Sequence, residues 1–431
     1  MLGLGAENLS LIKFLLKNKI DCRFTVCDPK SAAELGDRFL EIKELARKNK
    51  LPEINLMTGI DYDAHLADFD IVFRSPGYPL FNPNLSKAKK AGVEISSAMR
   101  IFFELSPSKN IIGITGSKGK GTTASLIYEI LKSAKKKVYL GGNIGMAPFE
   151  FIEKIKPNDF VILELSSFQL EDLQISPRIA VITNIFKEHL APADPNNPNY
   201  HQSMKDYWAA KTNIFAHQGK SDYLVVNEKL KNKLNKKEVI FYGKSDLPNK
   251  LTGEHNKENI AAAVAVAKIL KIKPVIVAQA VKKFRGLPHR LEFVAEINGV
   301  NYFDDSFATV PDVSVIALKS FIGGKNIILL AGGADKGSDF KNFAQQISKQ
   351  VKFLILFKGR GSERLKKELR IMNYKLRYLK EAENMKEAMM IVEKAAKPGD
   401  VVLLSAGCAS FGCFKNYKER GDLFKAEIKK I

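Results

Sequence analysis

Residues 113–123 read GITGSKGKGTT, and this segment determines how the centre of the chain folds and what it can bind. The apolar pair Ile111-Ile112 precedes it, and the amphipathic stretch ASLIYEILKSAKKK follows it. A strand, a glycine-rich turn, a lysine and a helix start form a cradle for phosphates, because the backbone N–H groups point toward the bound anion. Lys120 adds a mobile charge for the β- and γ-phosphates. The segment therefore predicts ATP binding.

The segment departs from a strict phosphate-binding loop at two positions. Such a loop has a glycine five residues before its Gly-Lys pair, where this chain has Ile114. It also has Ser or Thr directly after the lysine, where this chain has Gly121, and hydroxyl groups return only at Thr122 and Thr123. From the motif alone, a tight strand-to-helix turn whose lysines face water remains the alternative.

Length and charge limit the further interpretations. A chain of 431 residues predicts roughly two to four domains, and its hydrophobic (45%) and charged (27%) fractions are ordinary for a globular protein. The net charge of +21 is high, and a basic protein can bind nucleic acid or an anionic membrane. The lysines are spread along the chain without a basic tail or alternation with aromatic residues, so we expect a solvated surface and no nucleic-acid partner.

The cysteines and the apolar runs bear on the cellular compartment. Cys22 and Cys27, like Cys408 and Cys413, lack the spacing of a metal site, so we expect buried free thiols in a reducing cytoplasm. No apolar run approaches the ~18 residues of a membrane-spanning helix. The N-terminus has an early Glu7 and no basic segment. We therefore expect neither membrane insertion nor a signal peptide.

Alternating strand and helix signals predict an α/β protein with three domains. A glycine turn near residue 5 runs into a helix, and a strand over Arg23–Val26 ends at Asp28, although only Met1 and Leu2 precede the glycines as a first strand. Apolar runs that end in polar turns predict further strands, buried and parallel in the centre of the chain. These runs are Ile71–Pro79, Val161–Leu170, Ile179–Phe186, Asn326–Gly333, Phe353–Phe357 and Val401–Gly407. The expected domains are residues 1–97, 98–288 and 289–431.

Other motifs follow the glycine-rich segment in a fixed order. They are GGNIG (141–145), ELSSFQLE (164–171), Asn184 with His189, DYWAAKTNIF (206–215), GEHNKEN (253–259), GLPHRLE (286–292), DDSFAT (304–309), LAGGADKGSDF (330–340) and LLSAGCASFGCFKNYKERG (403–421). Together with GLGAENLS (3–10) and RSPG (74–77), they make the chain resemble the Mur ligase family along almost its whole length. The resemblance implies a Rossmann-like UDP-binding domain, a central ATPase domain of the P-loop type with a parallel sheet, and a C-terminal Rossmann-like domain.

The resemblance also implies a reaction. In this family a carboxylate attacks the γ-phosphate of ATP, and the amine of an amino acid then displaces phosphate from the acyl phosphate. The last two motifs favour the branch that adds D-glutamate to UDP-N-acetylmuramoyl-L-alanine, a step of peptidoglycan precursor synthesis. The implied cofactors are ATP, Mg²⁺ at two sites and a carbamate on Lys211. The implied protein is a cytoplasmic monomer with small-molecule substrates.

Site residues follow from the matched motifs. The resemblance gives Lys120, Glu164, His189 and Lys211 as catalytic, the last three with Thr122 as metal ligands. The implied ATP-binding residues are Gly116, Ser117, Lys118, Gly119, Lys120, Gly121, Thr122, Asn256, Asn259, Arg290 and Asp305. The implied contacts of the UDP-linked substrate are Ala6, Glu7, Asp28, Ser75, Pro76, Gly77, Asn143, Ser166 and Gln169. The implied contacts of D-glutamate are Thr309, Lys336, Ser410 and Tyr417.

Several positions depart from the family pattern. Gly121 replaces a hydroxyl residue, Phe307 a lysine, Gly412 an aspartate, Glu188 an aspartate and Tyr417 a phenylalanine. The loop after His189 is about eight residues longer than usual, a change that proteins tolerate well. These departures leave two alternatives open: a weakly active or non-catalytic relative that binds a nucleotide or nucleotide-sugar, and a sibling ligase with another amino-acid substrate.

Overall fold

The structure, a computed structural model of the whole chain, describes residues 1–190, 198–234, 238–251, 253–321, 324–335, 337–372 and 378–431. These residues divide into two compact units. The first contains Met1–Pro248 and Lys257–Lys282, and the second contains Asn249–Asn256 and Lys283–Ile431. The expected boundary at residues 288 and 289 lies close to this division, and the expected boundary at residues 97 and 98 lies inside the first unit. Both boundaries stay predictions.

Short parallel strands build the N-terminal part of the first unit. β1 (Thr25–Cys27) pairs with β2 (Asn55–Met57), and β3 (Ile71–Phe73) pairs with β4 (Glu94–Ser96). Leu2 is fully buried and bridges the two pairs, because it lies beside both Cys27 and Arg74. The expected remnant of a first strand is thus confirmed at Leu2. The helices of this region are α1 (Ala6–Lys17), α2 (Ala32–Leu35), α3 (Asp37–Lys48), α4 (Pro83–Lys90) and α5 (Ala98–Leu105).

A six-stranded, all-parallel sheet forms the centre of the first unit, in the order β10-β9-β8-β5-β7-β6. Its strands are β5 (Ile111–Thr115), β6 (Val138–Gly142), β7 (Phe160–Glu164), β8 (Ile179–Ile182), β9 (Tyr223–Asn227) and β10 (Ile240–Tyr242). The buried parallel strands predicted here are confirmed, but they end earlier than the apolar runs do. The run from Val161 to Leu170 breaks at Glu164, because Ser166 caps the short helix α7 (Ser167–Leu170).

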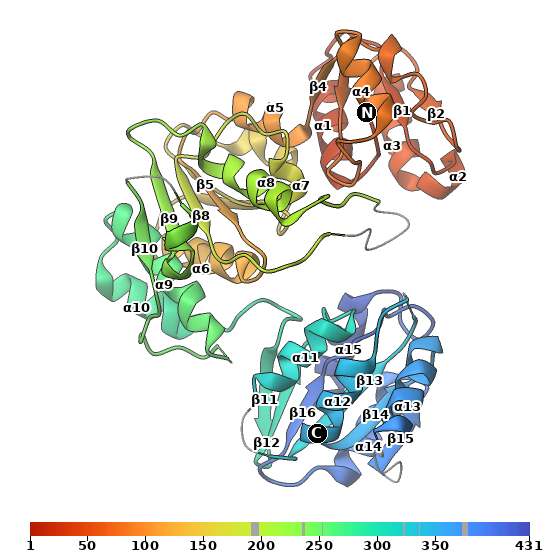
Figure 1. Cartoon of the computed structure of the whole chain (residues 1–431), viewed down its shortest axis with the longest axis vertical. Helices are drawn as coiled ribbons and strands as arrows, with labels where there is room; N and C mark the ends of the chain where they lie inside the picture. Colours follow the sequence, from red (N-terminus) through yellow and green to blue (C-terminus); the bar gives the residue numbers. More distant parts are fainter. Residues whose placement is uncertain (191–197, 235–237, 252, 322–323, 336, 373–377) are drawn as a thin grey trace. The chain divides into compact units, whose positions relative to one another are not determined.

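Helices cover the central sheet, as its apolar composition requires (Figure 1). They are α6 (Lys120–Ser133), α8 (Met204–Ala216), α9 (His255–Ile269) and α10 (Pro274–Lys283). α6 packs on β5, β6 and β7 with Leu126, Ile130 and Leu131 buried. Since all strands run the same way, their carboxyl ends meet at one edge, where parallel sheets bind ligands.

The second unit is an open sheet with helices on both faces, in the strand order β11-β12-β16-β13-β14-β15. Its strands are β11 (Glu292–Ile297), β12 (Val300–Asp304), β13 (Ile327–Gly332), β14 (Val351–Phe357), β15 (Leu379–Ala382) and β16 (Val401–Leu404). β11 is antiparallel to β12, and the remaining pairs are parallel. The predicted α/β fold class is therefore confirmed in both units.

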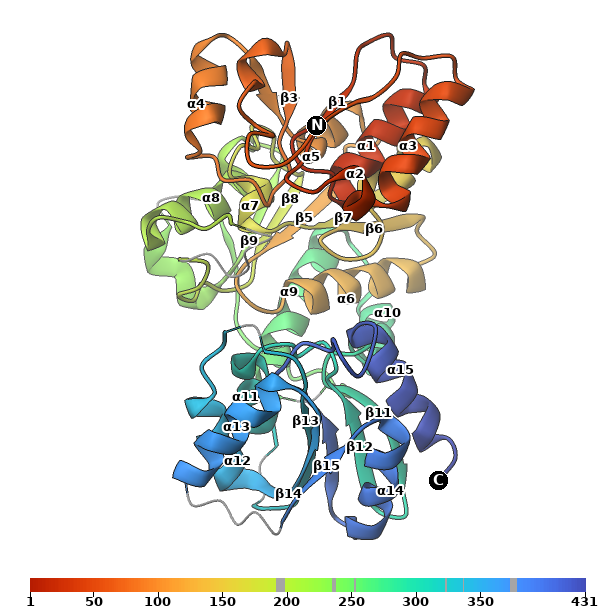
Figure 2. The ribbon, with the colours of Figure 1, turned by 90° about the vertical axis from the view of Figure 1, so that its right-hand side faces the viewer.

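Alternate residues of the buried strands face opposite helix layers. Leu329 and Leu356 pack with α11 (Pro311–Lys319), α12 (Lys341–Gln350) and α13 (Arg360–Ile371). Leu330 and Phe357 pack with α14 (Met385–Ala395) and α15 (Tyr417–Ile428). Figure 2 shows the two layers on either side of this sheet. A strand buried on both faces needs apolar residues at every position, which explains the continuous runs in the sequence.

All four cysteines are free thiols, as predicted. The prediction that they are buried is correct for Cys27 and Cys408, but Cys22 is exposed and Cys413 is partly exposed. Within the described ranges, no helix combines the length and the apolar character that a membrane crossing requires.

Candidate functional site

The loop after β5 is held in its shape by two glycines and by the end of β8. Gly116 has a φ of 142° and Gly119 a φ of 81°, conformations that favour glycine. A Cβ atom on Gly119 would lie 2.2 Å from Oδ1 of Asn259, so a side chain does not fit there. α6 begins directly at Lys120. The predicted strand, turn and helix start are thus present, and the N-terminus of α6 is the kind of helix end that presents backbone N–H donors to an anion.

Thr183 and Asn184, which follow β8, bind this loop through hydrogen bonds. The backbone N–H of Ser117 donates to the Asn184 carbonyl (2.8 Å), and that of Lys118 donates to Asn184 Oδ1 (2.7 Å). The Lys118 carbonyl accepts from Thr183 Oγ1 (2.7 Å) and from Asn184 Nδ2 (3.0 Å). Sequence reasoning assigned no role to Thr183. The signal for these contacts is that Thr183 and Asn184 follow β8, the strand next to β5.

Two lysines converge on the carbonyl oxygen of Gly116. Nζ of Lys120 donates to it at 2.9 Å and to the Ser117 carbonyl at 3.0 Å. Nζ of Lys211, from α8, donates to the same Gly116 oxygen at 2.9 Å. Only 1% of Lys211 is exposed, and burial together with repulsion from Lys120 lowers the pKa of its ammonium group well below the usual value. Lys211 is therefore a buried residue of the site, unlike most lysines, which face solvent.

Glu164 ends β7 beside the loop and is 3% exposed. Its Oε1 accepts a long hydrogen bond from Nδ2 of Asn143 (3.4 Å). Its Oε2 is buried without a hydrogen-bond partner among the described residues. A buried carboxylate oxygen without a donor is unfavourable, and a hard cation would satisfy it. Glu164 is therefore buried, and among the described residues it forms no surface salt bridge.

His189 lies after β8 with a φ of 59°, a conformation uncommon for a residue with a side chain. Its ring packs edge-on against Phe168, with ring centroids 5.2 Å apart. Burial lowers the pKa of this histidine; Lys211 and Lys120 act in the same direction, and the neighbouring Glu188 opposes them. The imidazole is therefore neutral near pH 7, as a metal ligand must be.

Glu188 and Tyr207 complete the surroundings of the loop, and sequence reasoning missed both roles. Oε1 of Glu188 accepts from the Tyr207 hydroxyl (2.8 Å), and its Oε2 pairs with Nζ of Lys118 (3.1 Å). The Tyr207 hydroxyl also lies 2.8 Å from Oγ of Ser117. Although burial opposes it, Lys118 and the tyrosine lower the pKa of Glu188. The glutamate therefore stays ionised and holds Lys118 beside the loop.

The other residues expected around ATP in the first unit lie near Gly119. Asn259 of α9 faces Gly119 and lies 3.5 Å from Oγ1 of the fully buried Thr123. Thr122, on the first turn of α6, is partly exposed. It is therefore the better placed of the two hydroxyls to replace the one missing at Gly121. Asn256, the second residue of the same helix, lies three residues earlier and belongs to the second unit.

The residues expected to contact the UDP-linked substrate form two groups. Asp28 accepts from the backbone N–H groups of Leu4 (2.8 Å) and Lys30 (3.0 Å), and the N–H of Ser75 donates to the Leu2 carbonyl (2.9 Å). The predicted turn is confirmed, since the N–H of Tyr78 donates back to Ser75 (3.0 Å). Ala6 is the first residue of α1.

The second group joins the N-terminal region to α7. Nε2 of Gln169 donates to the carboxylate of Glu7, and Ser166 and Gln169 cap α7 reciprocally. Burial raises the pKa of Glu7 to about 7. Glu7 and Gln169 are therefore direct neighbours, although they are far apart in the chain. The resemblance assigns both of them to the same substrate.

A buried arginine that the sequence did not single out lies next to this group. Arg74 is 1% exposed, and its guanidinium donates to Asp172 (2.8 Å) and to the carbonyls of Tyr78 and Phe168 (2.8 Å each). It precedes the Ser75–Gly77 turn directly. Its only sequence signal is its position at the end of an apolar strand, where a charge must be paired.

In the second unit, Arg290 lies over the ring of Phe307, with its guanidinium carbon 3.8 Å from the ring centroid. Tyr417, the first residue of α15, packs edge-on against the same ring at 5.0 Å. Asp305 is buried, and burial raises its pKa to about 7 although Ser405 donates to it (2.7 Å). Among the described residues Arg290 forms no ion pair within 4 Å of Asp305, although its charge acts to lower the pKa of that carboxylate.

The segments expected at D-glutamate are linked by a buried arginine. The guanidinium of Arg420 donates to the carbonyls of Ser306 (2.8 Å) and Cys408 (3.2 Å), and so brings the stretch around Thr309 to the stretch around Ser410. Ser410 is 5% exposed and Thr309 is partly exposed. Lys336 lies outside the described residues.

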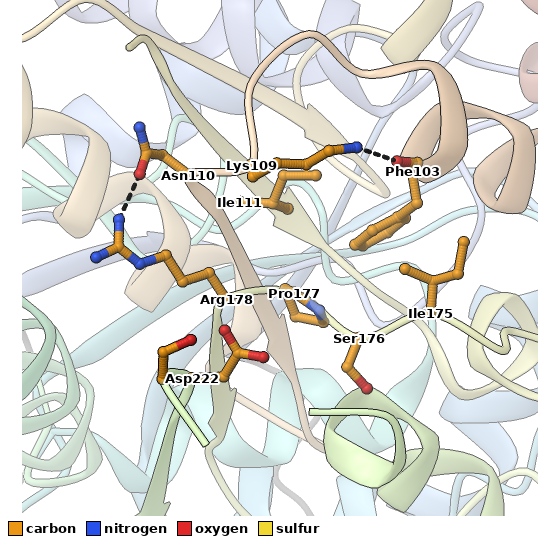
Figure 3. A pocket seen from close by; sticks show the side chains of 10 residues that line it. Phe103, Lys109, Asn110, Ile111, Ile175, Ser176, Pro177, Arg178 and Asp222 are labelled. Atoms are coloured by element: carbon orange, nitrogen blue, oxygen red, sulfur yellow. Dashed lines mark hydrogen bonds between the residues drawn. The ribbon is translucent and has the colours of Figure 1, made fainter. Parts of the chain in front are cut away.

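Two other features of the described part do not belong to this set. A cavity of about 390 Å³ opens beside Asn110, Pro177 and Arg178 (Figure 3). Those residues precede β5 and β8, so it lies at the amino ends of the strands, opposite the loop. One group of three side chains, His289, Glu292 and Asp304, could share a cation. Lys425 already pairs with both carboxylates there, at 2.9 and 3.4 Å.

Comparisons with known proteins cover all regions of the chain. Family models match residues 1–97 (Mur ligase MurD-like, N-terminal domain), 114–250 (Mur ligase middle domain) and 289–408 (Mur ligase, glutamate ligase domain). The chain is 37% identical to the UDP-N-acetylmuramoylalanine–D-glutamate ligases of Clostridium kluyveri and Clostridium tetani. The alignments cover 99% and 100% of this chain and 95% and 96% of those proteins.

Solved structures share the fold at lower identity. The MurF ligase of Thermotoga maritima in complex with ADP superposes with a TM-score of 0.61 at 17% identity, covering 98% of this chain and 99% of that one. The UDP-N-acetylmuramate-alanine ligase MurC of the same organism gives a TM-score of 0.57 at 18% identity, covering 100% and 98%. Both resemblances concern the three-dimensional arrangement alone.

Proposed function

The chain belongs to the Mur ligase family, and we propose that it joins D-glutamate to UDP-N-acetylmuramoyl-L-alanine with the conversion of ATP to ADP and phosphate. The observation that carries this proposal is the convergence of Lys120 and Lys211 on the Gly116 loop. Relatives with this activity in their names match the chain along nearly its whole length. Nothing in the comparisons favours a non-catalytic relative or a ligase for another amino acid.

The reaction follows two steps, and the residues around Gly116 serve the first. The alanyl carboxylate attacks the γ-phosphorus, the bond to the β-phosphate oxygen breaks, and ADP leaves. Two anions meet in this step, so cations must offset their repulsion. Lys120 and the N-terminus of α6 provide that charge. Lys118, held by Glu188, lies at the same loop. In the second step the amine of D-glutamate attacks the acyl carbon, phosphate leaves, and an amide forms.

Magnesium fits the residues at the carboxyl ends of β7 and β8. The unpartnered Oε2 of Glu164 is suited to one hard cation, and the neutral imidazole of His189 to the other, with Thr122 as a further oxygen ligand. Bound there, Mg²⁺ would neutralise phosphate charge. Arg290 and Asp305 are proposed for the nucleotide, and Thr309, Ser410, Tyr417 and Lys336 for D-glutamate.

Lys211 has the property that carbamate formation requires. Only a neutral amine adds carbon dioxide, and the lowered pKa of Lys211 favours that form near pH 7. The product would carry a carboxylate close to the ammonium group of Lys120 and able to bind Mg²⁺. A carbon-13 NMR spectrum of protein in ¹³C-bicarbonate should show a carbamate signal that Lys211→Ala lacks; an active enzyme without that signal would contradict the assignment.

Phosphate release tests the proposed reaction directly. We expect release to require ATP, Mg²⁺, UDP-N-acetylmuramoyl-L-alanine and D-glutamate together, with L-glutamate, L-alanine and L-lysine as controls. Release with another amino acid and none with D-glutamate would identify a sibling ligase, and binding without release would identify a non-catalytic relative. Because ATP and the nucleotide precursor are made in the cytoplasm, we place the reaction there. We propose a monomer, which sedimentation would test.

A further inference from the structure

Asn199 connects the Ser75–Gly77 turn to the segment that follows His189. Its Nδ2 donates to the carbonyl oxygen of Pro76 at 2.8 Å and lies 3.4 Å from Oε2 of Glu171. Asn199 is 4% exposed although it belongs to a polar, proline-rich stretch. The next residue, Tyr200, packs edge-on against Phe81 at 5.0 Å. The described end of the long loop is therefore attached to the N-terminal region.

His201 connects the same segment to His189. Its backbone N–H donates to the His189 carbonyl at 2.8 Å. This hydrogen bond holds His189 in its left-handed conformation, which few residues other than glycine adopt. The His201 ring stacks on Phe168, with centroids 4.8 Å apart and planes at 11°, while His189 packs on the edge of the same ring. The two histidines therefore share one aromatic neighbour.

One hydrogen bond and one close polar contact hold the His201 ring itself. Its Nε2 lies 2.9 Å from Oγ of Ser167, and its Nδ1 lies 3.3 Å from Oε1 of Glu171. The spacing resembles that of a serine hydrolase triad, but only 2% of Ser167 and 3% of His201 is exposed. No substrate carbonyl could reach the serine hydroxyl, so the set orients the ring rather than attacking a substrate.

Glu171 closes the network. Its Oε2 also lies 3.3 Å from Nη1 of Arg74, the residue directly before Ser75. The turn is thus linked to Glu171 in two ways: through Arg74, which precedes it, and through Asn199, which binds the Pro76 carbonyl. Glu171 in turn contacts His201, whose backbone N–H binds the His189 carbonyl.

We propose that Asn199 and His201 are positioning residues that couple occupancy of the Ser75–Gly77 turn by the UDP group to the orientation of His189, and hence to Mg²⁺-nucleotide binding. This proposal rests on the proposed function, because the family resemblance behind that function gives the turn to the UDP-linked substrate and His189 to the metal. Neither residue needs to touch a substrate. When the turn is occupied, a shift of the Pro76 carbonyl would move Asn199. Because His201 is only two residues further along the chain, its backbone N–H would move as well, and with it the hydrogen bond to the His189 carbonyl.

Calorimetry can measure this coupling in the full chain. The affinity of Mg²⁺ with a non-hydrolysable ATP analogue is determined with and without saturating UDP-N-acetylmuramoyl-L-alanine. We expect the parent to bind the analogue at least roughly fivefold more tightly with the UDP-linked substrate present, as in other coupled sites. Asn199→Ala and His201→Phe should reduce that ratio below about twofold. His201→Phe keeps the stacking and removes the polar contacts of the ring with Ser167 and Glu171.

Controls separate coupling from stability. Gln202→Ala, an exposed neighbour, should keep the parental ratio, and melting curves identify a variant that fails to fold. Asn199→Asp serves as a second variant, because a carboxylate cannot donate to the Pro76 carbonyl and should also lose the coupling. A parental ratio in both Asn199→Ala and His201→Phe, or no coupling in a parent that ligates, would overturn the proposal. A parent that neither ligates nor binds the UDP-linked substrate would instead overturn the proposed function.

Discussion

The Nζ atoms of Lys120 and Lys211 donate hydrogen bonds to one acceptor, the carbonyl oxygen of Gly116, each at 2.9 Å. Burial and then repulsion from Lys120 disfavour a second ammonium group there, and this lowers the pKa of Lys211. An anion bound at the loop would offset that repulsion. We therefore expect negative charge to be stabilised beside this pair during the reaction.

Lys120→Ala should abolish ligation and leave the fold intact. Its Nζ donates to the carbonyl oxygens of Gly116 and Ser117 in the glycine-rich loop, at the surface of the sheet edge and not in the apolar core, so we expect the fold to persist without it. Loss of a cation that stabilises transferring phosphate lowers kcat by roughly 100- to 1,000-fold. Phosphate release and circular dichroism measure the two effects. Lys136→Ala, at an exposed position beyond α6, is the matched control. Activity of Lys120→Ala within a few-fold of the parent would contradict the assignment.

Lys211→Met should inactivate the enzyme but stabilise it at pH 7 in bicarbonate-free buffer. In the unfolded chain the lysine titrates near its usual pKa of about 10.4. Between the lowered pKa of the folded state and that value, the unfolded chain binds more protons, so the parent gains stability as pH rises. The free energy of unfolding of the variant lacks this dependence on pH. At pH 7 it should exceed that of the parent by about 1–3 kcal/mol, and the difference should shrink as the pH approaches 10.

Urea unfolding of both proteins at pH 7 and pH 10 measures this difference. Lys205→Met, an exposed position on the same helix, should change the free energy of unfolding little at either pH. A destabilised Lys211→Met at pH 7 would show that the buried amine contributes more through its hydrogen bonds than it loses by desolvation.

The sequence predicted the strands and the loop well because both have strong local signals. Continuous apolar runs such as Ile327–Gly332 identify strands buried on both faces, and the glycines of the 116–119 loop require conformations that other residues avoid. The antiparallel hairpin of β11 and β12 was not predicted, because Glu292–Ile297 is only partly buried and lacks a continuous apolar run.

The network around the site could not be predicted, because its partners are far apart in the chain. Arg74 and Asp172 are 98 residues apart, and Ser117 and Tyr207 are 90 residues apart. Nothing in the sequence near either member indicates the other. Glu188 was read as a departure from the family pattern, yet its longer side chain reaches both Tyr207 and Lys118. Such contacts depend on how the sheet brings its strand ends together.

Phe307→Lys should weaken ATP use, although the sequence suggested the opposite. The family has a lysine at this position, and its pattern implies that Phe307→Lys restores a cation and so raises turnover or lowers the KM for D-glutamate. In the structure Arg290 already places its guanidinium over the Phe307 ring. A lysine would remove that stacking and add a like charge. A cation–π contact contributes about 0.5–2 kcal/mol, which corresponds to a rise of roughly 2- to 30-fold in the KM for ATP. Phe307→Tyr keeps the ring and should keep the KM. A higher turnover of Phe307→Lys would support the missing cation instead.

Glu7→Gln should stabilise the protein at pH 8 and have little effect at pH 5. Burial raises the pKa of Glu7 from 4.5 to about 7, so the folded state disfavours the ionised carboxylate. The stability that the parent has below pH 4.5 is therefore lost progressively as the pH rises toward 7. A glutamine removes this loss and can still bind Gln169. The shift corresponds to at most about 3 kcal/mol.

Melting temperatures at the two pH values, measured without substrate, test the Glu7 prediction. Glu44→Gln, at an exposed position on α3, is the control for the change in net charge and should leave both values unchanged. If Glu7→Gln gave no gain at pH 8, the carboxylate would be ionised in the folded protein and paired with a cation, most directly Arg74, whose charge acts on it. The UDP-linked substrate would then meet a charged Glu7, and its binding should weaken in Glu7→Gln independently of stability.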